Sequence, residues 1–182
     1  MSALLKVENL RIALKGDRVG LVAFAGQAFI QCPLTEDYGA ARMFLNFLGP
    51  DLIPVQGTDL GGAIDQAMRA LTDGSPDTTE GRAIILITDG EDHDAEAEKL
   101  LPALREKGIM VITVGIGTPA GSPVKDPVTG SFKKDDAGSI VQSRLNEALL
   151  KTIADKTGGR YIRLSGIDDA VSSIRGVIDN ME

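Results

Sequence analysis

Two stretches of the chain, residues 83–87 and 109–115, consist almost entirely of apolar side chains. Such runs are typical of strands that other elements cover on both faces, as in a parallel sheet. Residues 18–25 and 28–34 also have the pattern of strands, and the turn between them is too short for a parallel crossover, which needs about a dozen residues. The pattern therefore predicts parallel strands together with one antiparallel hairpin.

Apolar residues recur at three- and four-residue spacing around these strands, which is the pattern of helices with one buried face. The predicted helices are residues 3–14, 36–48, 60–71, 95–107, 143–156 and 168–181, and a last short strand covers residues 160–164. Strands that alternate with helices in this way form a doubly wound α/β domain. We therefore expect a single domain over residues 1–182, with helices on both faces of a mostly parallel sheet and the hairpin at one edge.

One segment departs from this alternation. Residues 118–140 are rich in Gly, Pro, Asp and Lys, and residues 128–132 have the composition of a hairpin tip. We expect this segment to form a loop or hairpin excursion from the sheet. Its acidic residues, Asp126, Asp135 and Asp136, are expected to be solvated rather than to bind a metal.

Composition and charge narrow the classes of function. The chain has 182 residues and a formal net charge of −7, and it lacks a basic cluster that would bind the phosphates of a nucleic acid. Its one cysteine, Cys32, cannot form an internal disulfide. No apolar run approaches the roughly 20 residues that span a bilayer, and residues 1–3 lead into a helical pattern without a secretion signal. These features predict a soluble chain without a membrane segment or a nucleic-acid partner.

Asp89 comes directly after the apolar run 83–87, and Gly90 behind it permits a sharp exit from the strand. In open α/β sheets, ligands bind just outside the carboxyl ends of the strands, so Asp89 is the first candidate for a functional residue. The alternative is that Asp89 caps the helix that begins near Asp94, a role that Asp often fills. The density of acids over residues 89–94 likewise indicates either a solvated turn or a cation site.

Thr58 precedes the predicted helix 60–71 and also allows two interpretations. As the N-cap it would satisfy an orphan amide of that helix, and it could equally present its hydroxyl to a hard cation such as Mg²⁺. A third cluster, Gly115-Ile116-Gly117, ends the strand 109–115. Its glycines indicate either close approach of the backbone to a ligand or a simple turn.

The residue constellations of common enzymes are missing from the sequence. His93 is the one histidine and has no cysteine or serine in a nucleophile-elbow setting, so neither a catalytic triad nor a zinc site is indicated. Gly61-Gly62 is not a phosphate-binding loop, because no strand precedes it and no Gly-Lys-Ser/Thr ending follows it. We therefore expect a protein that is not an enzyme.

Five segments, in order along the chain, carry a family resemblance. They are residues 16–25, residues 33–35 with Asp37-Tyr38, residues 57–60, residues 87–90 and residues 157–161. Together with the excursion that ends in Ser143-Arg144-Leu145 before a helix, they resemble the von Willebrand factor type A domain, and most closely the Bat-type proteins of bacterial aerotolerance operons. The resemblance covers nearly the whole chain and implies the three-layer, Rossmann-like α/β fold of that family.

The resemblance also implies a metal-ion-dependent adhesion site at the carboxyl edge of the sheet, filled by Mg²⁺ or Mn²⁺. It implies that Thr58 supplies a hydroxyl ligand and that Asp89 acts directly or through water. An acidic side chain of a partner protein would complete the octahedron. Mg²⁺ suits such a site because it prefers oxygen ligands and keeps open, water-filled positions.

The family's first motif, Asp-x-Ser-x-Ser, and the central strand before it have no counterpart in this sequence, which begins at the predicted first helix. We expect an N-terminally truncated domain, from a fragment or a misassigned start, that holds Mg²⁺ weakly or not at all. The strands that contain Val19 and Ile84 would then lack a neighbour, and unpaired buried backbone groups each cost about 1–3 kcal/mol. Either the two strands pair directly, or a segment of a second copy fills the gap in a strand-swapped homodimer.

The function that follows is a non-enzymatic protein–protein interaction module whose adhesion site is incomplete in this chain. Family membership implies a bacterial envelope protein whose domain is tethered by transmembrane helices that this chain lacks. Its partner would present an acidic side chain, and other Bat-type proteins or an AAA-type ATPase are candidates. The alternative is an α/β enzyme that binds a nucleotide or phosphate ligand at the same sheet edge, which would need a glycine-rich turn after its first strand.

Overall fold

The computed structural model describes residues 16–49, 55, 57–73, 81–91, 96–124, 129–134 and 138–181. Several sequence predictions fall elsewhere in the chain. Outside the described residues lie the predicted helix 3–14, the acids Asp92, Asp94, Asp126, Asp135 and Asp136, and His93.

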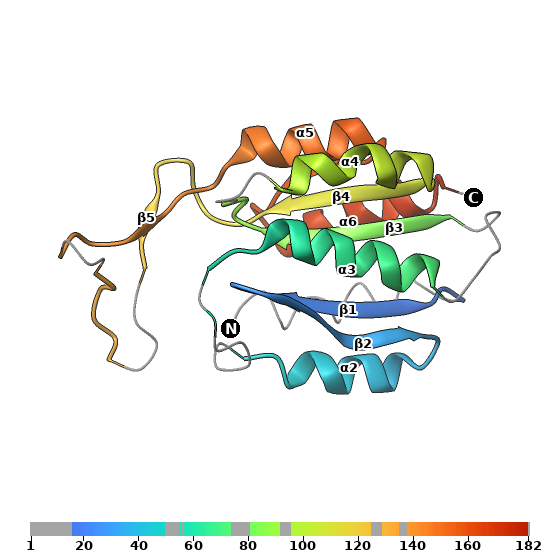
Figure 1. Ribbon diagram of the computed structural model, residues 1–182, viewed down its shortest axis with the longest axis horizontal. Coiled ribbons are helices and arrows are strands. Elements are labelled where there is room, and N and C mark those ends of the chain that lie inside the picture. Colours follow the sequence, from blue (N-terminus) through green and yellow to red (C-terminus); the bar gives the residue numbers. More distant parts are fainter. Residues whose placement is uncertain are drawn as a thin grey trace.

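The described helices and strands alternate as predicted. They are β1 (Val19–Phe24), β2 (Ala28–Thr35), α2 (Tyr38–Asn46), α3 (Leu60–Thr72), β3 (Arg82–Thr88), α4 (Glu96–Glu106), β4 (Ile109–Gly115), β5 (Ser122–Pro123), β6 (Gln142–Ser143), α5 (Glu147–Thr157), β7 (Tyr161–Arg163) and α6 (Ile167–Ile178). The parallel sheet has the order β3-β4-β7, and β1 pairs with β2 in an antiparallel hairpin. Helices α3, α4 and α5 cover one face of the parallel sheet and α6 covers the other (Figure 1), so the predicted three-layer α/β fold is confirmed.

The strand β4 is buried on both faces, as its apolar run predicted. Ile109 and Val111 belong to a cluster with α3, α4 and α5, whereas Ile112 and Val114 belong to a second cluster with β7 and α6. This division follows from the alternation of side chains along a strand. The β4 strand therefore holds the two helical layers together.

The hairpin and the parallel sheet are separate sheets within the described part of the chain. Of the two alternatives for the strands that contain Val19 and Ile84, direct pairing is therefore wrong. Helix α3 lies beside both sheets, because it contacts β1, β2 and β3, and it buries Ile64 completely. Side-chain packing on α3 thus connects the two sheets, and the strand-swapped homodimer stays a prediction.

The helix predicted over residues 143–156 begins later, at Glu147, and this places Ser143 in the excursion. The cause is Asn146, whose Oδ1 accepts a hydrogen bond from the Leu149 amide at 3.2 Å and so caps α5. Ser143 lies in β6, opposite Ser122 of β5. The excursion is therefore a two-stranded ribbon at its base.

Candidate functional site

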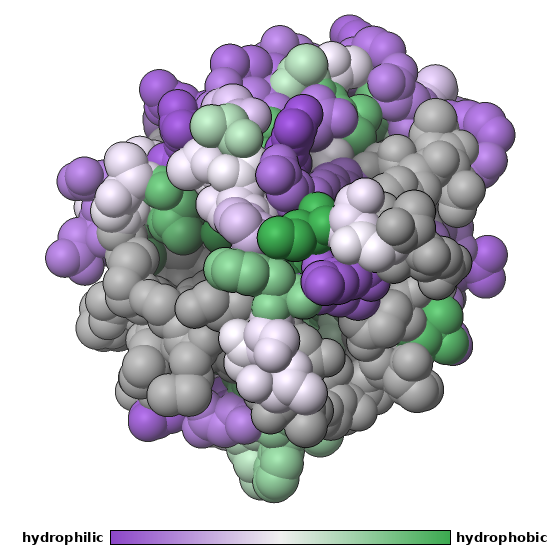
Figure 2. Space-filling view, turned by 90° about the vertical axis from the view of Figure 1, so that its left-hand side faces the viewer, coloured by the Kyte–Doolittle hydropathy of each residue, from purple (hydrophilic) through white to green (hydrophobic). Residues whose placement is uncertain are grey.

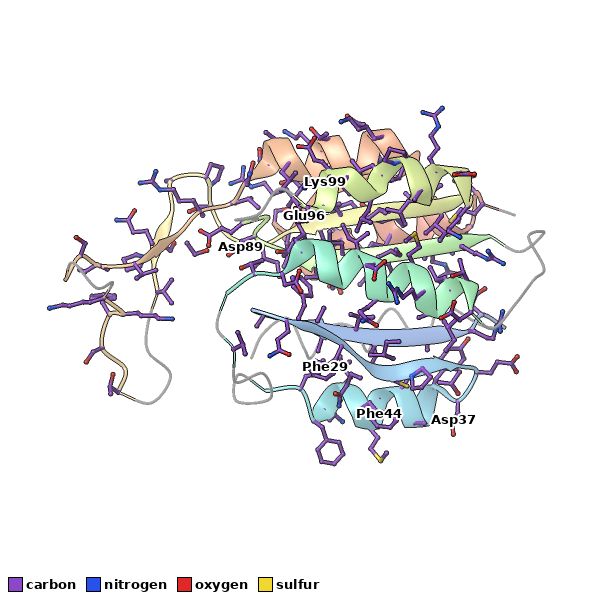
Figure 3. The ribbon with its side chains drawn as sticks, viewed as in Figure 1. Phe29, Asp37, Phe44, Asp89, Glu96 and Lys99 are labelled. Atoms are coloured by element: carbon purple, nitrogen blue, oxygen red, sulfur yellow. The ribbon has the colours of Figure 1, made fainter. Side chains whose placement is uncertain are left out.

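The loops that carry the two predicted metal ligands lie at the same rim of the molecule. β1 and β3 end, and α3 begins, at the left-hand side of Figure 1. Thr58 stands just before α3, and Asp89 directly follows β3. Figure 3 labels Asp89 at this rim. The structure thus places both residues at the edge where ligands of open α/β sheets bind.

The loop that contains Thr58 is attached to the end of β1. The Asp59 amide donates to the Ala25 carbonyl at 2.5 Å. Gly57 has a φ of +135°, and a Cβ at this position would lie 3.3 Å from the Cα of Gly26. Glycine suits both the backbone angle and the close approach. The half-buried Thr58 is therefore held beside the turn between β1 and β2.

Asp59, not Thr58, caps helix α3. Its Oδ1 accepts a hydrogen bond from the Gly62 amide at 2.7 Å, so the interpretation of Thr58 as the N-cap is wrong. A Cβ on Gly62 would lie 2.1 Å from the Asp59 carboxylate, and one on Gly61 would lie 2.6 Å from Cβ of Glu96 in α4. Glycine at position 62 therefore leaves room for the capping carboxylate of Asp59, and glycine at position 61 allows α4 to pack closely against α3. Because Asp59 fills this role, the Thr58 hydroxyl is not required to cap α3.

The Asp89 carboxylate is held by the excursion rather than by a helix. Its Oδ2 accepts a hydrogen bond from Ser143 Oγ at 2.7 Å, and its Oδ1 accepts one from the Glu91 amide at 3.3 Å. Gly90, directly after Asp89, has a left-handed φ and does not begin a helix, so the alternative that Asp89 is the N-cap of the following helix is wrong. The apolar pattern assigned Ser143 to a helix and the family resemblance placed it at the end of the excursion, and neither indicated its contact with Asp89.

The backbone around Asp89 is fixed by its neighbours. The Thr88 hydroxyl accepts a hydrogen bond from the Gly90 amide at 3.1 Å, and the Asn146 amide donates to the Asp89 carbonyl at 2.8 Å. Gly90 has a φ of +75°, and a Cβ there would lie 3.0 Å from the carbonyl oxygen of Asn146. Glycine at position 90 therefore allows both the left-handed turn after β3 and the close approach of α5.

The glycine cluster at the end of β4 allows close packing. A Cβ on Gly115 would lie 2.8 Å from the Tyr161 hydroxyl and 3.0 Å from a methyl group of Leu145. The Ile116 amide donates to the Thr88 carbonyl at 2.9 Å, and Gly117 then turns the chain with a φ of +108°. These contacts favour the turn over the ligand-binding interpretation of this cluster.

The donor chemistry of the rim fits a hard divalent cation. A threonine hydroxyl and a carboxylate are ligand types that Mg²⁺ and Mn²⁺ prefer. The carboxylate oxygens of Asp89 accept hydrogen bonds, but a carboxylate has about four lone-pair sites, which leaves room for a cation or its water. In the described ranges, no group of three or more His, Cys, Asp or Glu side chains could hold a metal ion by itself. Thr58 and Asp89 therefore suit a cation that keeps most of its waters.

Glu147 and Tyr161 form a second polar pair, at the first turn of α5. The Tyr161 hydroxyl donates to Glu147 Oε1 at 2.9 Å, and Lys151 and Arg163 form ion pairs with the same carboxylate. The hydrogen bond from Tyr161 lowers the pKa of Glu147. Burial, and then the hydrogen bond to Glu147, raises the pKa of Tyr161 to about 12.

The free energy of unfolding is expected to fall between about pH 10 and about pH 12 because of Tyr161. In this range the folded protein keeps the phenol proton that the unfolded chain loses, so rising pH favours unfolding. Urea denaturation of the wild type and of Tyr161→Phe, at about pH 9 and about pH 11.5, measures this contribution. The variant should lose less stability between the two conditions. An equal loss in both proteins would contradict the assignment to Tyr161.

Two solved structures from Bacteroides match nearly the whole chain. The conserved hypothetical protein BatB from Bacteroides thetaiotaomicron is 39% identical with a TM-score of 0.91, and the match covers 99% of this chain and 86% of that one. An aerotolerance-related membrane protein from Bacteroides fragilis is 38% identical with a TM-score of 0.90, and the match covers 98% of this chain and 87% of that one.

Two more distant proteins share less with this chain. The manganese-loaded TRAP protein of Plasmodium vivax is 17% identical with a TM-score of 0.69, over 97% of this chain and 65% of that one, which is a likeness of fold alone. The calcium-activated chloride channel regulator 1 of Sus scrofa is 26% identical over 121 residues, or 66% of this chain. The matched part is 13% of that protein, so this chain corresponds to a small portion of it.

The family model described as the von Willebrand factor type A domain matches residues 4–174, which is most of the chain. The two Bacteroides structures are similar to this chain over almost its full length, and they support the resemblance to Bat-type proteins. The chain therefore belongs to the von Willebrand factor type A domain family.

Proposed function

We propose that this domain is a non-enzymatic protein-interaction module that binds a divalent cation, Mg²⁺ or Mn²⁺, through Thr58 and Asp89. The observation that carries the proposal is the position of Asp89 at the carboxyl end of β3, on the same rim as Thr58, whose hydroxyl is not the cap of α3. Thr58 would contribute a hydroxyl ligand, and Asp89 would act directly or through water. An acidic side chain of a partner protein would complete the coordination.

Binding by this chain alone is expected to be weak. Thr58 and Asp89 supply two of the roughly six ligands that octahedral Mg²⁺ takes, and the remaining positions would be filled by water or by the partner. The manganese-loaded TRAP protein of Plasmodium vivax, which shares the fold, supports the choice of a divalent cation. Mn²⁺ is therefore a suitable ion with which to measure cation binding by this chain.

The similarity to Bat-type proteins suggests the setting. The Bacteroides fragilis protein is described as an aerotolerance-related membrane protein. In this chain, none of the helices within the described ranges has the length and apolar character that a membrane span needs. The domain would belong to a bacterial aerotolerance-type envelope protein, and its partners would be other Bat-type proteins or an AAA-type ATPase.

Asp89→Asn is expected to weaken Mn²⁺ binding at the rim by about tenfold or more, the scale on which changes at and around metal ligands act. The amide that replaces the carboxylate has no negative charge, so its oxygen attracts a divalent cation less strongly. The measurement is the paramagnetic broadening of backbone amide signals by Mn²⁺ in NMR spectra, which detects weak binding. Broadening should be confined to the loops that carry Thr58 and Asp89, and it should be lost in the variant.

Asp155→Asn makes the same chemical change near the C-terminal end of α5 and should leave the broadening as it is in the wild type. Thr58→Val should weaken the broadening, whereas Thr58→Ser keeps the hydroxyl and should retain it. Equal broadening of the wild type and Asp89→Asn would place the cation elsewhere. Tight binding of a nucleotide at the rim would favour the enzyme alternative and overturn the proposed module.

A further inference from the structure

Three hydrogen bonds attach the base of the excursion to the loop after β3. We refer to the described residues between 118 and 146 as the arm. The Ser143 hydroxyl donates to Asp89 Oδ2 at 2.7 Å, the Arg144 amide donates to Glu91 Oε1 at 3.1 Å, and the Asn146 amide donates to the Asp89 carbonyl at 2.8 Å. Two of these bonds end on carboxylates of the loop that carries the proposed cation ligand. The arm and that loop therefore form one hydrogen-bonded unit.

The arm determines where Ser143 lies. Its strands β5 and β6 pair antiparallel, with Ser122 opposite Ser143. The Leu145 amide donates to the Thr118 carbonyl at 3.1 Å and closes the base of the arm. In Figure 1 the arm extends away from the rim, beyond the ends of β3 and β4. A displacement of the arm that breaks these bonds to the loop would therefore move the Ser143 hydroxyl relative to Asp89.

Exposed apolar side chains lie farther out on the arm. Phe132 is 47% exposed and Ile140 is 46% exposed, and Lys133 and Lys134 beside Phe132 are exposed as well. Figure 2 faces this side of the molecule and shows hydrophobic residues exposed among hydrophilic ones. A protein that contacts this surface would touch the same element that carries Ser143.

The bond from Ser143 fixes the orientation of the Asp89 carboxylate. Ser143 holds Oδ2 while the Glu91 amide holds Oδ1, so both oxygens point in defined directions. A hydrogen bond to an ionised carboxylate is stronger than one between neutral groups. Donors that orient a metal-binding group in this way typically change metal affinity by about 10–100-fold when they are removed.

We propose that Ser143 is a positioning residue of the cation site, and that the arm brings it to Asp89, so that the position of the arm and the cation affinity are linked. The proposal rests on the proposed function in one respect, namely that Asp89 takes part in cation binding. Linkage is reciprocal, so a partner that shifts the arm would change the cation affinity, and the cation would change the affinity for that partner by the same factor.

The test compares Ser143→Ala, Ser143→Thr and Ser122→Ala in two measurements. The first is Mn²⁺ affinity from paramagnetic broadening, and the second is hydrogen exchange of the Arg144 and Asn146 amides without metal. Ser143→Ala should weaken Mn²⁺ binding by about tenfold and speed up exchange at both amides. Ser143→Thr keeps the hydroxyl and should restore both properties. Ser122→Ala alters the exposed serine across the ribbon and should change neither.

Three outcomes would count against this role. If Ser143→Ala speeds up amide exchange but binds Mn²⁺ like the wild type, Ser143 stabilises the contact between the arm and the loop after β3 without affecting the cation. That result overturns the proposal. If Ser143→Ala binds Mn²⁺ more tightly, the hydroxyl competes with the cation, which also overturns it. If Asp89→Asn and the wild type bind Mn²⁺ equally, the proposed function fails and the role of Ser143 fails with it. This last result does not involve a change at Ser143, so the two failures are distinguishable.

Discussion

Replacing Gly159 with alanine is expected to destabilise the protein by about 3 kcal/mol or more, the upper range for overpacking. Gly159 lies between α5 and β7, and an added Cβ would stand 2.0 Å from the carbonyl oxygen of Val111 and 2.6 Å from its carbonyl carbon. Val111 is fully buried in β4, where it pairs with Ile84 of β3. Because the clash is with backbone rather than a flexible side chain, relief would require β4 or the connection to β7 to move. Urea unfolding followed by circular dichroism measures the loss.

Gly176→Ala is the matched control for this prediction. Gly176 lies inside α6, and an added Cβ would meet nothing within 4 Å. Alanine is favoured over glycine in a helix interior by about 0.5–1 kcal/mol, so this variant should be more stable than the wild type. The same chemical change should therefore shift the free energy of unfolding in opposite directions at the two sites. Equal urea midpoints for the two variants would contradict the packing assigned to Gly159.

Ile64→Ala is expected to lower the free energy of unfolding by about 2–5 kcal/mol, the range for truncation of a fully buried aliphatic side chain. Ile64 is completely buried in α3, within the cluster that α3 forms with β3, α4 and α5. Truncation leaves a cavity that the surrounding elements fill only in part. Since α3 also contacts β1 and β2, the loss would weaken the connection between the two sheets. The urea midpoint of the variant reports the effect.

Ile87→Ala makes the same change on β3, at a side chain that is 38% exposed. Water already reaches this side chain, so less apolar surface is lost from the core, and we expect a cost of about 1 kcal/mol or less. A larger loss for Ile87→Ala than for Ile64→Ala would show that α3 does not pack as described.

Local patterns predicted the strands well, because a strand that is buried on both faces has an almost continuous run of apolar residues. The apolar run 83–87 lies within β3, and the run 109–115 coincides with β4, which is covered by helices on both faces. The short turn after residue 25 likewise required the antiparallel pairing of β1 with β2.

Choices between neighbouring polar residues could not be made from the sequence. Thr58 and Asp59 are both good N-caps, and the path of the chain into α3 selects Asp59. At α5, the apolar pattern extends the helix back to Ser143, whereas the cap in the structure is Asn146. The bond from Ser143 to Asp89 joins residues 54 positions apart, so no local signal indicates it.

Local sequence patterns also could not show whether the hairpin and the parallel sheet are joined by hydrogen bonds. Pairing between β1 and β3 depends on how far apart α3 holds them, and the residues of either strand do not encode that distance. The ladder that one of the two alternatives required between them is absent within the described ranges. The position of Asp89 at a strand end, by contrast, followed from its sequence neighbours alone.

The division into two sheets would give a bound cation a mechanical role. Thr58 belongs to the loop that is bonded to the end of β1 through the Asp59 amide and the Ala25 carbonyl, whereas Asp89 ends β3. Packed side chains on α3 permit small sliding movements, which a continuous hydrogen-bonded ladder would resist. A cation bound to both Thr58 and Asp89 would therefore link the β1–β2 hairpin to the parallel sheet. Without the cation, this additional link between the hairpin and the parallel sheet would be lost.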